Sequence, residues 1–285
     1  MHPPIDLSIV IVNYNTRQLL LDCLASIYAT AGTLALECIV VDNASTDGGT
    51  EAVHMVFPQT KIIANVQNRL FSAANNQGIA LATGRYVLVL NPDMVVRGQT
   101  LSQLVQQMDA DPTIGAATTT LLFPDGRLQR NCARFVTYEY LLLNYTFLGK
   151  LFRQRLRRYN DWLWYAHWDR TTRRPVDVLP GSCIIAPRAV WLATGGFDTR
   201  MPMYFSDDYL SRAVQKLGKQ TMYLVSDGIV HYEGYSARQV KAWALRLYMH
   251  DLVVYTRLVF GRAAQALLLI LFLPTWIVLR LKARG

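Results

Sequence analysis

The chain has 285 residues, of which 52% are hydrophobic, and its formal net charge is +9. This length allows one large α/β domain with appendages, and the positive charge favours anionic partners such as nucleotide diphosphates, acidic lipid surfaces or nucleic acid. The four cysteines form no Cys-x-x-Cys pair and lie within apolar runs, which argues against a zinc site or a disulfide framework and predicts buried thiols in a reducing compartment. The segment 1–4 leads directly into an apolar run, so no signal peptide is predicted.

The first third of the chain alternates apolar runs with amphipathic segments. The sequence predicts strands over 7–12, 38–41, 60–64 and 86–90, of which the continuous apolar runs 7–12 and 86–90 are expected to be buried. A helix is predicted from about residue 17 to 29, with Thr16 as its N-cap, and another begins near Ser72. Because alternating strands and helices are typical of a parallel sheet with right-handed crossovers, we predict an α/β fold with a mostly parallel sheet flanked by helices.

Further elements follow along the rest of the chain. We predict helices over 100–108, 138–148 and 207–217, and strands over 114–122, 176–179 and 219–225. The stretch 150–174 differs, because seven arginines alternate there with tryptophans and tyrosines. We interpret it as a basic insert at a membrane interface, where arginine attracts anionic headgroups and tryptophan is enriched. A solvated loop or a contact between copies in a homo-oligomer are the alternatives.

Polar residues end several of the predicted strands. The strand over 86–90 stops at Asn91-Pro92-Asp93, since proline cannot continue a central strand. Asp93 is therefore expected at the carboxyl end of a strand, where open α/β sheets bind ligands, and its carboxylate would suit Mg²⁺ or Mn²⁺. The alternative is an ordinary turn.

The C-terminal region has a different pattern. Residues 237–260 suit an amphipathic helix, and 263–279 are apolar except for Gln265 and Pro274. That length lies at the lower edge of the roughly 17–25 residues that a spanning helix needs, and basic residues flank both ends. We expect an interfacial or re-entrant anchor in which Pro274 breaks the segment. A true span is the second choice, and a helix packed on the domain or on a partner subunit is the third.

An ordered series of motifs resembles the family-2 glycosyltransferases with a GT-A, Rossmann-like fold. The series runs through "SIVIVNYN", "VVDNASTDGG", "NNQGIALATGRYVLVLNPD", "PDGRLQ", "PGSCIIAPR", "GGFD", "MYFSDDYLSR" and "VHYEGYS". The "LNPD" and "PDGRLQ" pieces look most like the rhamnosyltransferase-like branch, which builds cell-surface polysaccharides. The resemblance implies a catalytic domain over 1–236, a membrane-associating helical segment over 237–285, and inverting transfer of a sugar from a nucleotide-sugar to a hydroxyl.

The resemblance also implies roles for single residues. Asp93 matches the family's metal position, and His231 matches the histidine that helps to hold the metal or the diphosphate. Asp207 matches the general base, with Asp208 as the alternative. The competing interpretations are a core or surface histidine for His231 and a helix N-cap pair for the two aspartates.

The nucleotide-sugar donor needs its own residues. Asp42 matches the position that contacts the base or ribose, although it could also stabilise a turn. The other candidates are asparagines near the predicted strand ends or on the following helix: Asn13, Asn15, Asn76 and Asn91. Asn76 could instead be a helix cap. Phosphate contacts from Arg130 or Arg134 are weaker candidates, because loop arginines are commonly solvated.

Two departures from the family pattern leave a second interpretation open. Leu70 stands where the family usually has glycine in Asn-x-Gly-Phe, and Tyr209 replaces the later acid of the acidic motif. Both would suit a non-catalytic subunit that binds nucleotide-sugars within a glycan-building complex. A processive synthase is disfavoured, because several long apolar spans and a Gln-x-x-Arg-Trp motif are missing from the sequence.

The anchor and the resemblance together suggest the partners. An acceptor sugar carried on a polyprenyl diphosphate would explain an anchored enzyme at the cytoplasmic face of the cell membrane. A basic surface with aromatics is also typical of nucleic-acid binding, but the parallel-sheet site residues do not support that use.

Overall fold

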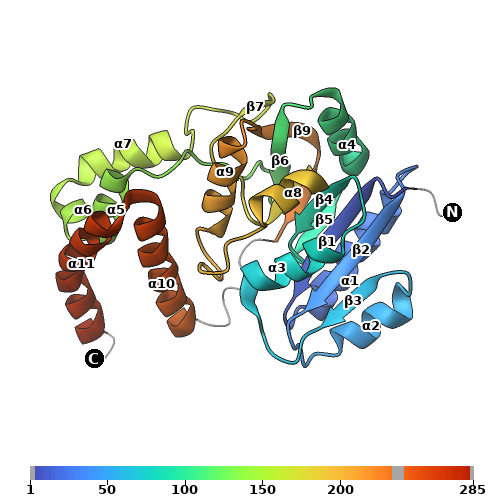
Figure 1. Cartoon of the computed structure of the whole chain (residues 1–285), viewed down its shortest axis with the longest axis horizontal. Coiled ribbons are helices and arrows are strands. Elements are labelled where there is room, and N and C mark those ends of the chain that lie inside the picture. The colour runs from blue at the N-terminus through green and yellow to red at the C-terminus, as the bar shows by residue number, and fades with distance from the viewer. Residues whose placement is uncertain (1–3, 233–240, 283–285) are drawn as a thin grey trace.

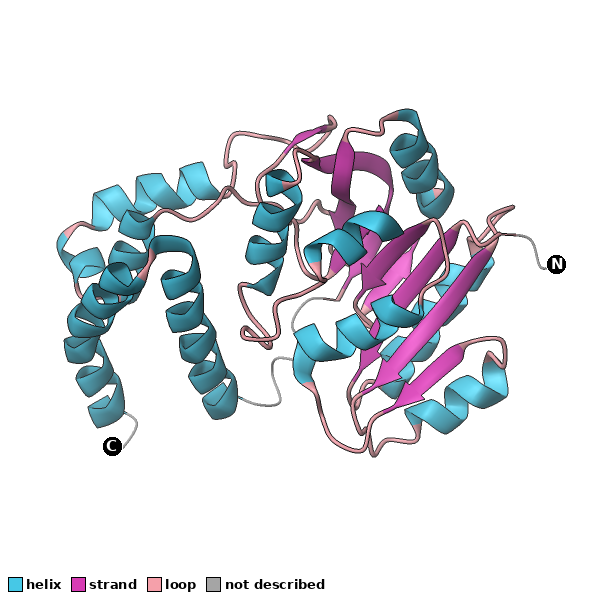
Figure 2. Ribbon diagram, in the orientation of Figure 1, coloured by secondary structure: helices cyan, strands magenta, loops and turns pink. Residues whose placement is uncertain are grey.

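A single sheet organises the chain in the computed structural model, which describes residues 4–232 and 241–282. Within these residues nine strands join in the order β3-β2-β1-β4-β8-β6-β9-β5, with β7 paired to β9 (Figures 1 and 2). The strands are β1 (Leu7–Asn13), β2 (Leu36–Asp42), β3 (Lys61–Ala64), β4 (Tyr86–Leu90), β5 (Met94–Val96), β6 (Ile114–Leu122), β7 (Arg174–Pro175), β8 (Cys183–Pro187) and β9 (Gln220–His231).

The first four strands are parallel and end at a common edge. Their register pairs Asn13 with Asp42, Asp42 with Ala64, and Ile11 with Leu90. The predicted strands over the first third of the chain are therefore confirmed. Because the register is continuous, residues that follow β1, β2 and β4 meet at one side of the sheet.

The second half of the sheet is mixed, which the sequence pattern did not predict. β8 runs antiparallel to both β4 and β6, and β5 runs antiparallel to β9. The strand predicted over 176–179 is wrong, because β7 ends at Pro175 and Val178 forms only an isolated bridge with Ala133. The last strand, predicted over 219–225, is longer than predicted and ends at His231.

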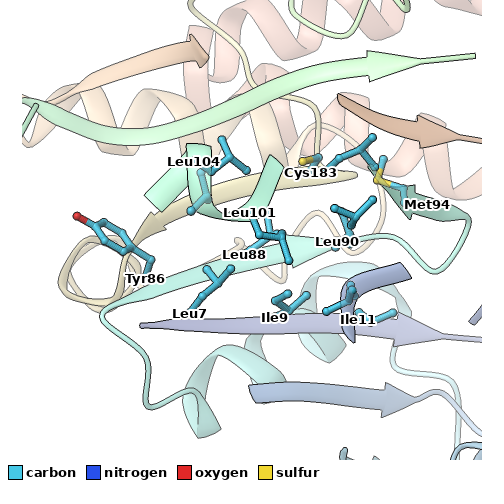
Figure 3. Close-up of a cluster of buried hydrophobic side chains, with 14 of the residues drawn as sticks. Leu7, Ile9, Ile11, Tyr86, Leu88, Leu90, Met94, Leu101, Leu104 and Cys183 are labelled. Atoms are coloured by element: carbon cyan, nitrogen blue, oxygen red, sulfur yellow. The ribbon is translucent and has the colours of Figure 1, made fainter. Parts of the chain in front are cut away.

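Helices cover both faces of the sheet (Figure 2). Alternate β1 residues Leu7, Ile9 and Ile11 belong to a core shared with one set of helices, while Val10 faces the other set. Figure 3 shows Leu90, Met94 and Cys183 gathered where the strands end. The first set comprises α1 (Arg17–Ala29), α2 (Gly49–Val56) and α4 (Thr100–Ala110), and the second comprises α3 (Leu70–Leu81), α8 (Arg188–Thr194) and α9 (Ser206–Lys216).

A separate group of helices lies beside the sheet. It comprises α5 (Tyr138–Tyr145), α6 (Leu148–Leu151), α7 (Arg153–Leu163), α10 (Lys241–Phe260) and α11 (Arg262–Lys282), with α10 and α11 drawn in red in Figure 1. These helices share a core that includes Leu141, Leu163, Leu252 and Leu268. The predicted domain boundary at 236/237 lies outside the described residues.

Three helix predictions need correction. The helix predicted over 138–148 ends at Tyr145, and much of the basic stretch forms α7 where a solvated loop was one alternative. Pro274 lies inside a continuous α11 and does not break it. No helix in the described part of the chain is long and apolar enough to cross a membrane. All four cysteines are buried, as predicted.

Candidate functional site

The ends of β1 and β2 are locked together by side-chain hydrogen bonds. Nδ2 of Asn13 donates to Oδ1 of Asp42 over 2.8 Å and to Oγ of Ser45 over 3.1 Å. Thr16 is the N-cap residue of α1, as predicted, but its Oγ1 donates to Oδ1 of Asn13 over 2.7 Å and forms no bond with the helix backbone. Asp42 and Asn13 are both buried, so this network fixes the β2–α2 loop.

The other residues predicted to bind the nucleotide-sugar donor also contact the backbone of nearby loops. Oδ1 of Asn15 accepts from the backbone of Thr46 over 2.8 Å. Asn76 binds the backbone of Phe197 twice, donating to its carbonyl over 2.8 Å and accepting from its N–H over 2.9 Å. The backbone N–H of Asn91 donates to the carbonyl of Ser182 over 3.0 Å. These residues therefore hold loops at the sheet edge, and donor contact stays a prediction for each of them.

Left-handed backbone conformations occur in the loops around this edge. Asn15, Ala44, Leu70 and Phe205 have φ values of 52°, 63°, 61° and 60°. This conformation costs a residue with a Cβ atom about 1–2 kcal/mol, and such strain clusters at functional sites. Leu70, which stands where the family pattern has glycine, keeps the backbone conformation that glycine adopts most readily.

Asp93 and His231 meet through the pairing of β5 with β9. Met94 is aligned with His231, and the backbone N–H of Tyr232 donates to the carbonyl of Asp93 over 2.9 Å. Oδ1 of Asp93 lies 3.6 Å from Nε2 of His231, and the two side chains are 6% and 12% exposed. The residues that the sequence singled out as a metal-binding pair are thus brought together at the sheet edge.

Gln129 fixes the His231 ring and was not identified from the sequence. Its Nε2 donates to the carbonyl of His231 over 2.9 Å, so its Oε1 faces Nδ1 of the ring, at 3.0 Å. Nδ1 must therefore carry a hydrogen, and in the neutral ring the lone pair is on Nε2, on the side of Asp93. The "PDGRLQ" motif contains this glutamine, but only the fold relates it to His231.

The facing atoms of Asp93 and His231 suit the coordination of a divalent cation. A carboxylate oxygen and a neutral imidazole nitrogen are ligands that Mn²⁺ accepts, and a second hydrogen bond that fixes the ring is typical of histidine ligands. In the described residues no group of three or more histidine, cysteine or acidic side chains could hold a metal ion. A metal site with only two protein ligands is typical of enzymes in which the phosphates of the substrate supply further oxygen ligands.

Asp207 lies across the same edge, at the start of α9. Its Oδ2 accepts from the backbone N–H of Gly181 over 3.0 Å, and its Oδ1 accepts from the N–H of Asp208 over 3.0 Å. Removal of water from the carboxylate raises the pKa of Asp207 above its ordinary value, and the two backbone N–H groups oppose this effect. The side chain is half-buried, so a ligand could still reach it.

Asp208 has a different environment although it is the next residue. It is buried, and its Oδ1 accepts from Nε of Arg212 over 2.8 Å and from the hydroxyl of Tyr255 over 2.6 Å. Burial raises the pKa of Asp208 to about 6, while Arg212 and Tyr255 lower it. Because Tyr255 belongs to α10, this carboxylate joins the sheet domain to the helical group.

Backbone contacts connect the two carboxylate regions. Asn91, directly after β4, bonds to Ser182, and the neighbouring Gly181 bonds to Asp207. The turn 180–182 therefore lies between the β4 end, which leads to Asp93, and the N-terminus of α9. The arrangement places one metal-suited pair and one partly accessible carboxylate at the edge where parallel strands end, which is the usual ligand-binding side of such sheets.

Several known proteins are similar to this chain in sequence. Residues 8–170 match the protein family described as "Glycosyl transferase family 2". The chain is 26% identical over 245 residues to the N-acetylglucosaminyl-diphospho-decaprenol L-rhamnosyltransferase of Mycobacterium tuberculosis, covering 81% of this chain and 77% of that protein. It is 28% identical over 233 residues to the O-antigen biosynthesis protein RfbC of Myxococcus xanthus, covering 80% of this chain and 17% of that protein.

Solved structures show the same fold at low sequence identity. The S. aureus TarS 1-349 structure is similar with a TM-score of 0.54 and 15% identity, covering 80% of this chain and 60% of that one. GalNAc-T7 with UDP, GalNAc and Mn²⁺ is similar with a TM-score of 0.63 and 15% identity, covering 89% of this chain and 48% of that one. The chain therefore spans less than two thirds of these structures, and the likeness concerns the fold alone.

Proposed function

Because the chain belongs to glycosyl transferase family 2, we propose that it moves a sugar from a nucleotide diphosphate-sugar to a hydroxyl of a lipid-linked glycan acceptor, with inversion at the sugar carbon. The fold is GT-A, and the relatives act in polysaccharide biosynthesis. The observation that carries the proposal is the meeting of Asp93 and His231, 3.6 Å apart, at the carboxyl edge of the parallel strands. The printed name of the mycobacterial relative supports rhamnose as the first donor sugar to test.

The leaving diphosphate needs its charge offset. Asp93 and His231 would hold a Mg²⁺ or Mn²⁺ ion, with the His231 ring oriented by the bond between its Nδ1 and Gln129. A divalent cation stabilises the negative charge of a departing diphosphate without a proton transfer. The residues that would contact the rest of the donor are those at the same strand ends and turns: Asn13, Asn15, Asp42, Asn76 and Asn91.

The acceptor hydroxyl needs a base. We assign this role to Asp207, because Asp208 is already bonded to Arg212 and Tyr255 and is buried. As the acceptor oxygen attacks the sugar carbon, its proton passes to the Asp207 carboxylate and the bond from the sugar to the diphosphate breaks. The raised pKa of Asp207 suits a general base, because it makes the carboxylate a better proton acceptor.

Membrane association is a further part of the proposal. The described side chains of α11 include exposed Leu267 and Ile270, at 43% and 67%, and α7 carries several exposed arginines. An exposed apolar helix face together with basic residues suits peripheral binding to an anionic membrane at its cytoplasmic face. Either a peripheral or a re-entrant anchor would keep a lipid-linked acceptor near the sheet edge.

One experiment tests the central proposal. The purified chain is given a panel of nucleotide-sugars with Mn²⁺ or Mg²⁺, and release of the nucleoside diphosphate is measured with and without chelator. We expect metal-dependent hydrolysis of one donor, because water can replace the acceptor. Saturable donor binding without any hydrolysis would instead favour the non-catalytic subunit, which the strained Leu70 at a usual glycine position supports.

A further inference from the structure

A cavity lies between α10, the start of α11 and the loop that precedes α9. Its volume is about 680 Å³. The first half of the chain contributes nothing to its lining, so it is separate from the Asp93 site. The lining residues are Arg200, His250, Val254, Arg257, Leu258, Gly261, Arg262 and Gln265.

The polar part of this cavity is positively charged. Three arginines and one histidine line it, and no carboxylate does. Arg200 is held by Asp198 at 2.6 Å, whereas Arg257 and Arg262 are exposed and form no ion pair with any residue in the described ranges. Guanidinium groups bind phosphate oxygens in pairs of parallel hydrogen bonds, so this arrangement suits a phosphate or diphosphate group.

Apart from Gly261 and Gln265, the remaining lining is apolar and continues away from the charges. Val254 and Leu258 line the cavity from α10. On α11, Leu269 and Leu273 follow Arg262 by seven and eleven residues, which places all three on one face of the helix. Leu269 and Leu273 are 45% and 54% exposed. A diphosphate attached to an alkyl chain would satisfy both parts, whereas a nucleoside diphosphate would place a polar ribose against the leucines.

The cavity is joined to the candidate base by a short loop. Oδ2 of Asp251 accepts from the backbone N–H groups of Met203 and Tyr204, over 2.9 and 2.8 Å, and so fixes the loop 198–205 against α10. Arg200 lies in that loop, and Asp207 follows it directly. A ligand whose diphosphate is bound in the cavity could therefore present an attached sugar toward Asp207.

We propose that this cavity binds the diphosphate of the lipid-linked acceptor, with the first part of its polyprenyl chain along Leu269 and Leu273. The proposal rests on the proposed function, because it identifies the acceptor side of the same site. Arg257 and Arg262 would bind the phosphate oxygens, and Arg200 would close the cavity from the side of Asp207.

Farnesyl diphosphate serves as the probe for this site. Its binding to the full chain is measured by titration calorimetry below its micelle concentration, beside farnesol, inorganic diphosphate and UDP. We expect the unaltered chain to bind farnesyl diphosphate at least about tenfold more tightly than farnesol or inorganic diphosphate, and UDP, whose proposed site is the strand edge at Asp93, should not compete with it. The double variant Arg257→Ala/Arg262→Ala should lose about tenfold or more in this affinity, since two charge-assisted contacts are removed.

Arg246→Ala is the matched control, because Arg246 is exposed on the same helix and does not line the cavity. It should bind farnesyl diphosphate like the unaltered chain. Equal loss in both variants, or an unchanged double variant with a normal melting temperature, would overturn the proposal. Arginine-dependent binding to phosphatidylglycerol vesicles without binding of farnesyl diphosphate would also overturn it, since a membrane headgroup would then be the ligand. Donor hydrolysis with Mn²⁺ by the unaltered chain tests the proposed function separately.

Discussion

Gln129 forms two hydrogen bonds with His231, one to its backbone carbonyl and one to Nδ1 of its ring. The two residues lie 102 positions apart in the sequence. The first bond determines which end of the glutamine amide faces the ring, and the second then leaves the lone pair of the neutral ring on Nε2. This relationship gives Gln129 an indirect role in the Asp93 site, as a positioning residue.

Replacement of Gln129 by leucine should weaken metal binding without removing a ligand. Loss of a partner that orients a histidine ligand usually costs 10- to 100-fold in metal affinity, and we expect about that loss for Mn²⁺. The measurement is the Mn²⁺ concentration that gives half-maximal donor hydrolysis. Gln107→Leu is the control, since Gln107 also donates to a β9 carbonyl over 2.9 Å, at Val225. A similar shift in both variants would mean that the effect is on the strand and not on the ring.

Asp93→Asn should abolish metal-dependent hydrolysis of the donor. The change keeps the size of a side chain that is only 6% exposed, but it removes the charge that would bind the cation. We expect a fall of at least about 100-fold in turnover at saturating donor, and a melting temperature within a few degrees of the unaltered chain. Near-normal hydrolysis in Asp93→Asn with Mn²⁺ supplied would remove this carboxylate from the metal site.

The fall of the reaction rate at low pH should follow the protonation of the Asp207 carboxylate. The base works as a carboxylate, so the rate falls as pH drops through its pKa. Because burial raises the pKa of Asp207, the fall should begin at a higher pH than the ordinary value of 3.8 implies. Asp207→Asn should lose transfer while it still binds the donor.

The pH–rate profile of Asp208→Asn shows which of the two carboxylates, Asp207 or Asp208, acts as the base. It removes the charge of a group whose pKa is raised to about 6 and so weakens the bonds that this side chain accepts from Arg212 and Tyr255. We expect lower stability but an acid limb at the same pH as in the unaltered chain. If the limb instead vanishes with Asp208 and survives in Asp207→Asn, the assignment of the base is reversed.

Local sequence patterns were sufficient for the parallel half of the sheet. β1, β2 and β4 are apolar runs that end at or directly before Asn or Asp, and such runs are recognisable because both faces of each strand are covered, whereas β3 lies at the edge of the sheet and is partly exposed. The meeting of Asp93 and His231 also followed from matched motifs, although their distance depends on the pairing of β5 with β9.

The mixed half of the sheet could not be predicted in this way. β8 is as long as β4, but α8 begins directly after it at Arg188, so no polar turn marks the end of the strand in the sequence. Its antiparallel direction depends on contacts with β4 and β6, far away in the sequence. For the same reason, neither Gln129 nor the bond between Tyr255 and Asp208 could be found from local pattern.

The exposed apolar face of α11 should control membrane binding. Leu267→Gln/Ile270→Gln replaces two exposed apolar side chains on this helix. Burial of each in a bilayer interface is worth roughly 1.5–3 kcal/mol, so we expect the affinity for phosphatidylglycerol vesicles to fall about tenfold or more. Sedimentation with vesicles measures this. Leu192→Gln, on α8 and 58% exposed, is the control and should bind like the unaltered chain. Unchanged binding of the double variant would exclude α11 as the anchor.

Leu70 should respond differently to glycine and to alanine. Its backbone has φ of 61°, and it is held there by Asn68, which accepts from its N–H over 2.8 Å, and by Asn43, which donates to its carbonyl over 3.3 Å. Both substitutions remove the leucine side chain, but only glycine relieves the left-handed strain. We therefore expect Leu70→Gly to be more stable than Leu70→Ala by about 1 kcal/mol in urea unfolding.

The same pair of variants tests whether the Leu70 side chain narrows the donor site. If it does, both variants should lower the donor KM to a similar degree, because both shorten the side chain next to the network of Asn43 and Asn68. A donor KM that falls only in Leu70→Gly would point to backbone freedom as the cause. A KM unchanged in both variants, with the stability difference still present, would leave Leu70 as a strained residue without influence on the donor, and the case for a non-catalytic subunit would lose its main support.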